Sequence, residues 1–200
     1  LEALADGAGS GERHRRALGD ARSFGERIVA RDDSGVDVYD EYGYDWGFGS
    51  ALHLAATLAV HDAGVRIVHI VMDGDFDTHE GHDWRHPALM ADLDRNLVAF
   101  HAELDADRVA VMTVSEFGRT AAENGSRGLD HGTASTALVL GPGTGGRFGR
   151  HPSLTSLDEH GDLIATAPFE NYLAGTVGHW LGLPADSLFP SATDHLRPFS

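Results

Sequence analysis

Residues 65–86 read "VRIVHIVMDGDFDTHEGHDWRH", an apolar segment that passes directly into a polar one. The first part, residues 65–73, is rich in β-branched residues and shows little alternation of polar and apolar positions. Such a run is typical of a strand covered on both faces, as in a parallel sheet. We therefore expect a buried parallel strand here, with the polar segment following its C-terminal end.

The rest of the chain contains the pattern of an α/β domain. Strands and helices alternate, which favours an α/β fold with a mainly parallel sheet. We expect residues 1–49 to form a poorly defined segment of helix and loop, and residues 50–200 to form the α/β domain. The spacing of apolar residues predicts helices from an N-cap at Ser50 to Gly64, over 87–106 and over 169–183, and buried strands over 109–114 and 135–141.

Composition and charge exclude several classes of protein. The formal net charge is −16 and the 15 basic residues are all arginine, without the concentrated positive charge that binds nucleic acid. Cysteine is absent, so metal ligands must be His, Asp or Glu. No apolar stretch reaches the roughly 18 residues that span a bilayer. Because the chain starts at Leu1, within an apparent helix, we expect it to be incomplete at its N-terminus.

The polar segment contains the strongest candidate metal ligands. Asp77 and His79 are two residues apart, so their side chains face the same way in an extended segment. Asp75 and His79 are four residues apart and converge if the segment forms a helical turn. Carboxylate and imidazole groups together suit a divalent ion such as zinc or iron. The simpler alternative is a solvated loop on an acidic protein.

Two later motifs also place polar groups beside predicted strands. "SEFGR" contains Glu116, a candidate ligand or general base, and Arg119, a candidate clamp for an oxyanion. "GLDHGT" contains Asp130 and His131, which can both reach a metal from a turn. A salt bridge at a strand end and an ordinary turn with a capping Asp would give the same patterns. Loops that follow parallel strands meet at one sheet edge, so we expect these motifs to form one site.

The motifs in this order resemble a known family. "DGDFDTH", "SEFGRTAAENGSRGLDHGT" and "FENYLAGTVGHWLGL" are similar to the C-terminal part of exported bacterial proteins known as domain of unknown function 1501. The resemblance covers about residues 50–190 and implies the alkaline phosphatase and sulfatase superfamily. That superfamily has an α/β/α sandwich with divalent metals at the C-terminal strand edge.

The resemblance also implies a ligand set. Asp75 or Asp77, together with His79 and His131, would hold one divalent metal ion, which could be zinc, manganese, calcium or iron. Asp130 would supply a further carboxylate. Phe117 stands where superfamily members have a histidine ligand for a second metal.

The function implied by the resemblance is metal-dependent hydrolysis of phosphate or sulfate esters, on small-molecule or polymeric anions. The metal would polarise the ester oxygen, Glu116 would act as a ligand or base, and Arg119 would bind the anion. The alternative is a catalytically inert exported protein that uses the fold for surface binding or scaffolding, which Phe117 favours. A third alternative is a mononuclear redox site on two histidines and a carboxylate. Export through a twin-arginine signal is implied by the resemblance alone.

Overall fold

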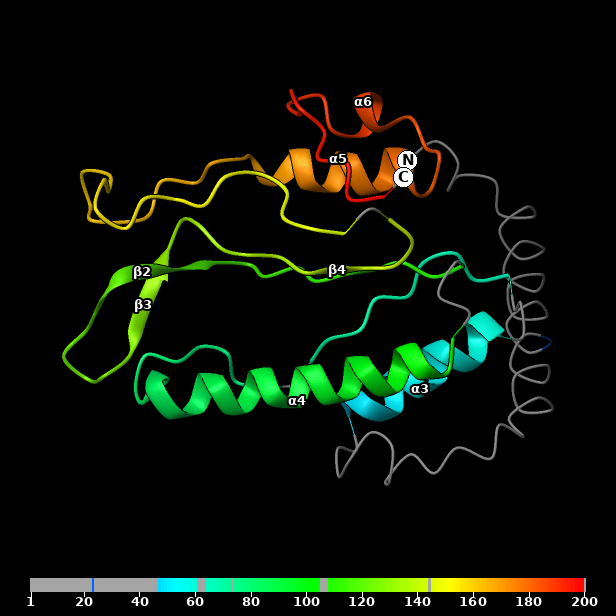
Figure 1. Cartoon of the computed structure of the whole chain (residues 1–200), viewed down its shortest axis with the longest axis horizontal. Helices are drawn as coiled ribbons and strands as arrows, with labels where there is room; N and C mark the ends of the chain where they lie inside the picture. Colours follow the sequence, from blue (N-terminus) through cyan, green and yellow to red (C-terminus); the bar gives the residue numbers. More distant parts are fainter. Residues whose placement is uncertain are drawn as a thin grey trace, which may run out of the picture. The chain divides into compact units, whose positions relative to one another are not determined.

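The computed structural model describes residues 23, 47–60, 64–72, 74–104, 108–143 and 145–199 (Figure 1). The chain divides into two compact units, Leu1–Asp73 with Arg95–Leu104, and Gly74–Asp94 with Asp105–Ser200. Among the described residues, no helix is both long and apolar enough to cross a membrane.

The first unit contains α3 (Phe48–Val60) and the C-terminal part of α4 (His82–Ala102). Phe48 and Leu52 on α3 are buried, as are Leu97 and Phe100 on α4. The ring of His53 on α3 contacts the carboxylate of Glu103, with Nδ1 and Oε2 3.0 Å apart. The first predicted helix is therefore confirmed, although it begins at Phe48 and Ser50 lies inside it rather than at its N-cap.

Residues 65–72, predicted to form a buried strand, do not belong to a strand. Ile67 and Val71 are 69% and 65% exposed. An apolar run records a preference for burial, whereas a strand also needs a neighbouring strand with which to pair. The prediction of a buried parallel strand at this place is wrong.

Among the described residues of the second unit, four short strands lie along the two arms of one long hairpin (Figure 1). Both ladders are antiparallel and both are centred on the turn at residues 124–128. A bond of 3.0 Å from Thr113 N to Leu138 O extends the outer ladder toward that turn. The outer strands are β1 (Val111–Met112) and β4 (Val139–Leu140), and the inner strands are β2 (Gly118–Glu123) and β3 (Leu129–Gly132).

This hairpin contradicts the expected α/β/α sandwich with a mainly parallel, alkaline phosphatase-like sheet. Parallel neighbours need a crossover connection of about a dozen residues or more. The chain between the predicted strands 109–114 and 135–141 is long enough for a crossover, but it folds back on itself as β2 and β3. The outer segments therefore run in opposite directions. The two predicted strands are confirmed in part, because β1 and β4 lie within them.

Helix α4 begins at His82, before the predicted start at Pro87. The backbone amides of Trp84 and Arg85 donate to the carbonyl of Gly81, at 3.3 and 3.0 Å. Pro87 lies inside the helix, where its missing N–H removes one intrahelical hydrogen bond. The end of the polar segment is consequently helical, and residues 77–79 precede the helix as a loop.

Helix α5 (Phe169–His179) packs against the short α6 (Ala185–Leu188) and confirms most of the predicted closing helix. Tyr172 on α5 is buried, and its hydroxyl lies 3.0 Å from the carbonyl oxygen of Thr113 and 3.4 Å from that of Leu138. These two residues adjoin β1 and β4. One phenol therefore joins α5 to both arms of the hairpin.

Tyr172 gives a direct test of this packing. Burial raises its pKa to about 12, above the value near 10 of an unfolded tyrosine. The stabilising contribution of the protonated phenol should thus be complete below about pH 10 and be lost between about pH 10 and 12. Phenolate absorbance should show one of the four tyrosines ionising late. Tyr172→Phe should remove this late component and lower the free energy of unfolding by about 1 kcal/mol; a persistent late component would contradict the assignment.

Candidate metal centre

Backbone hydrogen bonds attach the loop that carries Asp77 and His79 to the turn of the inner hairpin. Both partners lie in the second unit. The carbonyl and amide groups of residues 78–82 pair with those of residues 126–129, so the loop lies alongside the turn. The bonds run from Leu129 N to Thr78 O (3.2 Å), from Gly81 N to Ser126 O (3.3 Å) and from His82 N to Arg127 O (2.9 Å).

Two residues of the turn allow this close approach. A Cβ atom on Gly128 would lie 2.0 Å from the carbonyl oxygen of His79, so only glycine fits there. Asn124 accepts at Oδ1 from the amides of Ser126 and Gly128, at 2.9 and 3.0 Å, and donates from Nδ2 to the carbonyl of His79 at 2.9 Å. Asn124 therefore shapes the turn and holds the loop against it.

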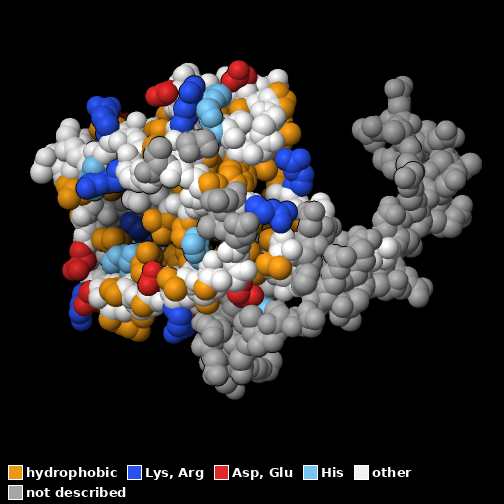
Figure 2. Space-filling view, turned by 45° about the vertical axis from the view of Figure 1, so that its right-hand side comes forward, with side chains coloured by type: hydrophobic (Ala, Val, Ile, Leu, Met, Phe, Trp, Pro, Cys, Tyr) orange, Lys and Arg blue, Asp and Glu red, His pale blue; other side chains and the backbone are white. Residues whose placement is uncertain are grey.

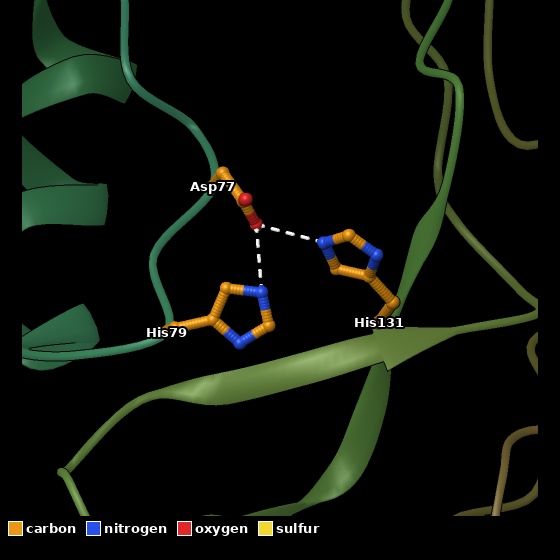
Figure 3. Close-up of side chains that lie close together, drawn as sticks. All are labelled: Asp77, His79 and His131. Atoms are coloured by element: carbon orange, nitrogen blue, oxygen red, sulfur yellow. Dashed lines mark hydrogen bonds and ion pairs between the residues drawn. The ribbon is translucent and has the colours of Figure 1, made fainter.

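Three side chains converge where the loop meets β3 (Figure 3). Asp77 and His79 point from the loop toward His131 on β3. Oδ1 of Asp77 lies 2.9 Å from Nε2 of His131 and 3.2 Å from Nε2 of His79. One ligand atom from each residue lies within 4.8 Å of the others, a spacing that can hold a metal ion.

Arg119 fixes the position of Asp77. It stands opposite His131 in the register of the inner ladder. Its guanidinium donates to Oδ1 of Asp77 at 2.7 Å, to the carbonyl of Phe76 at 2.8 Å and to that of Leu129 at 2.6 Å. The guanidinium thereby joins the loop, β2 and β3, the three segments around the site.

An aromatic contact fixes the second histidine. The ring of Phe117 stacks on that of His131, with centroids 3.9 Å apart and planes at 15°. Phe117 also contacts Arg119, whose guanidinium carbon lies 4.8 Å from the ring centroid. Phe117, which cannot coordinate a metal, thus packs against a residue that can.

The ionisation state of Asp77 and the exposure of the three side chains suit a metal ligand set. Hydrogen bonding from His131 first, and from Arg119 second, lowers the pKa of Asp77. Asp77 is therefore a carboxylate at neutral pH. Its side chain is 45% exposed, and those of His79 and His131 are 47% and 49% exposed, so water reaches all three. Two imidazole nitrogens, one carboxylate oxygen and an open side form the donor set of a metal centre with free coordination positions.

The other predicted site residues lie in different places. Asp130 is outside the group of three, and its Oδ1 accepts from Nδ1 of His79 at 2.8 Å. Hydrogen bonding from Asn124 first, and from His79 second, lowers the pKa of Asp130. Asp75 forms an ion pair with Arg85, and Glu116 is exposed on the bend before β2. Of the five predicted metal ligands, the structure brings together Asp77, His79 and His131.

Sequence reasoning missed Asn124 and the contact made by Phe117. Asn-Gly at 124–125 is a strong hairpin signal, and it could have identified Asn124 as a turn residue. Its bonds to His79 and Asp130 depend on the loop beside it. No local pattern marks Phe117 as a partner of His131, because the two are joined only by the hairpin.

Comparison with known proteins gave one match. A family model described as "Protein of unknown function (DUF1501)" matches residues 28–199. No curated protein and no solved structure matches the chain.

Arg119 offers a test of the architecture around the centre. Arg119→Met should lower the free energy of unfolding by about 1.5–3 kcal/mol, because it leaves two carbonyls and a carboxylate without their charged donor. Its side chain is 16% exposed, whereas Arg127, which pairs with Asp83, is 71% exposed. Arg127→Met is therefore the matched control, with an expected loss of less than about 1 kcal/mol. Equal losses in urea unfolding of the two variants would contradict the role given to Arg119.

Proposed function

Because the chain belongs to the DUF1501 family of proteins of unknown function, we propose its function from the site, as a centre for one divalent metal ion. The observation that carries the proposal is the convergence of Asp77, His79 and His131. Two imidazoles favour zinc or iron over calcium, which prefers oxygen ligands. Zinc bound by three protein ligands and a water is the arrangement of catalytic sites.

The proposed reaction is hydrolysis of a phosphate or sulfate ester. A bound dication would polarise the ester oxygen and lower the pKa of a bound water. The half-exposed ligands support this function, since substrate and water can reach their ligand atoms. The protein residues hold the ligand set in place, with Arg119 anchoring Asp77 and Phe117 packing against His131.

Two observations favour the second candidate, a catalytically inert exported protein that uses the metal for binding or scaffolding. The guanidinium of Arg119 already donates to three acceptors, which opposes the anion-binding role suggested by the sequence. Glu116 lies outside the group of three, so no general base is assigned from the candidate residues. Export of the protein stays a prediction in both cases.

Metal analysis and calorimetry test the centre itself. The purified full chain should bind one equivalent of zinc, and His79→Ala and His131→Ala should each weaken binding by at least about 100-fold, because two protein ligands remain. His160→Ala is the matched control, since His160 is exposed and pairs with Glu159. Manganese, iron and calcium are compared under the same conditions. Wild-type affinity in both ligand variants would remove the proposed centre.

Hydrolysis separates the two candidate functions. A panel of phosphate and sulfate esters is assayed with the zinc-loaded chain, the two ligand variants and His160→Ala. The enzyme proposal expects ester hydrolysis that is at least about 100-fold slower in His79→Ala and His131→Ala, because the metal supplies the polarisation. Stoichiometric zinc binding without hydrolysis of any ester would favour the binding or scaffolding protein.

A further inference from the structure

Both ring nitrogens of His79 face a carboxylate. Nδ1 lies 2.8 Å from Oδ1 of Asp130, and Nε2 lies 3.2 Å from Oδ1 of Asp77. A neutral imidazole carries one proton, so only one nitrogen can donate and the other presents a lone pair. The choice between them decides whether Nε2 can bind a metal.

The surroundings of the two carboxylates place the proton on Nδ1. Oδ1 of Asp77 already accepts from Arg119 at 2.7 Å, and it also lies 2.9 Å from Nε2 of His131. The 2.8 Å contact of His79 with Asp130 is shorter than its 3.2 Å contact with Asp77. Nδ1–H therefore donates to Asp130, and the lone pair of Nε2 is directed toward Asp77 and His131.

Asp130 is itself held in place. Asn124 donates from Nδ2 to Oδ1 of Asp130 at 2.9 Å and from the same nitrogen to the carbonyl of His79 at 2.9 Å. The side-chain amide of Asn124 thus fixes the carboxylate of Asp130 and the backbone of His79, whose ring that carboxylate contacts. Asn124 lies at the start of the turn and Asp130 lies on β3, so the hairpin presents the acceptor.

We propose that Asp130 is a positioning residue rather than a metal ligand. It fixes the tautomer and ring orientation of His79 so that Nε2 binds the ion, and Asn124 holds Asp130 in that role. This inference rests on the proposed metal centre. A carboxylate that accepts from the outer nitrogen of a ligating histidine typically contributes 10- to 100-fold to metal affinity.

Zinc affinity of the full chain tests the proposal. Asp130→Ala should raise the dissociation constant for zinc by about 10- to 100-fold. Asp130→Asn should raise it less, because an amide oxygen still accepts from Nδ1–H. Asp186→Ala is the matched control: it also removes an exposed carboxylate that contacts a histidine, His195, at 3.3 Å. Its dissociation constant should stay within about twofold of the wild-type value.

The tautomer of His79 provides a readout that needs no metal. In the metal-free chain, at a pH where imidazoles are neutral, nitrogen NMR should show His79 protonated on Nδ1. Asp130→Ala should shift the population toward the Nε2–H form, and Asp186→Ala should leave it unchanged. A purely structural role for Asp130 would leave this population unaltered.

Different outcomes would contradict the role of Asp130 and the metal centre itself. Wild-type His79 protonated on Nε2, or equal zinc affinities in wild type and Asp130→Ala, would overturn the role of Asp130 while leaving the centre intact. A wild-type chain that binds no zinc would remove the proposed function, whatever the tautomer shows. Loss of affinity in both Asp130→Ala and Asp186→Ala would reduce the effect to general loss of negative charge and would also overturn the proposal.

Discussion

The candidate centre depends on one constraint, the backbone attachment of residues 78–82 to the hairpin turn at residues 126–129. Asp77 and His79 lie on the loop, whereas His131 lies on β3, so the ligand set exists only while the two segments stay paired. The side chains of Arg119 and Asn124 add to this attachment by donating to the carbonyls of Phe76 and His79. The attachment therefore combines three backbone hydrogen bonds with side-chain bonds from the hairpin.

The hairpin supplies one half of the site. Its register places Arg119 opposite His131, so the residue that anchors Asp77 and the residue that meets it come from neighbouring strands. Phe117, which directly precedes β2 on the arm that contains Arg119, packs on His131. Figure 2 shows that apolar, basic, acidic and histidine side chains are mixed on the described part of one face of the protein. The hairpin and the loop beside it together form the site, and the ligands remain accessible to water.

The neighbours of Phe117 in the structure change how this residue is interpreted. From the resemblance, Phe117 stands in place of a histidine ligand for a second metal. That replacement argued against catalysis. The structure makes it a support for His131, which is consistent with one metal centre. The same contacts give Arg119 a different role: it binds Asp77 and two carbonyls, and its part in the site is to hold a ligand. The geometry therefore supports metal binding more directly than ester hydrolysis.

The sequence by itself determined the chemistry that is available: no cysteine, carboxylates and imidazoles grouped in short motifs, and helices near 48–60 and 169–179. Residue type, spacing and the family resemblance also placed Asp77, His79 and His131 among five candidate metal ligands. Only the tertiary structure decided which side chains meet. Apolar runs carry no information on strand direction, so the parallel sheet was a wrong prediction and the long hairpin replaced it. The place of Asp130 beside His79, and of Asp75 and Glu116 outside the group of three, likewise follows from the tertiary structure, which no local pattern encodes.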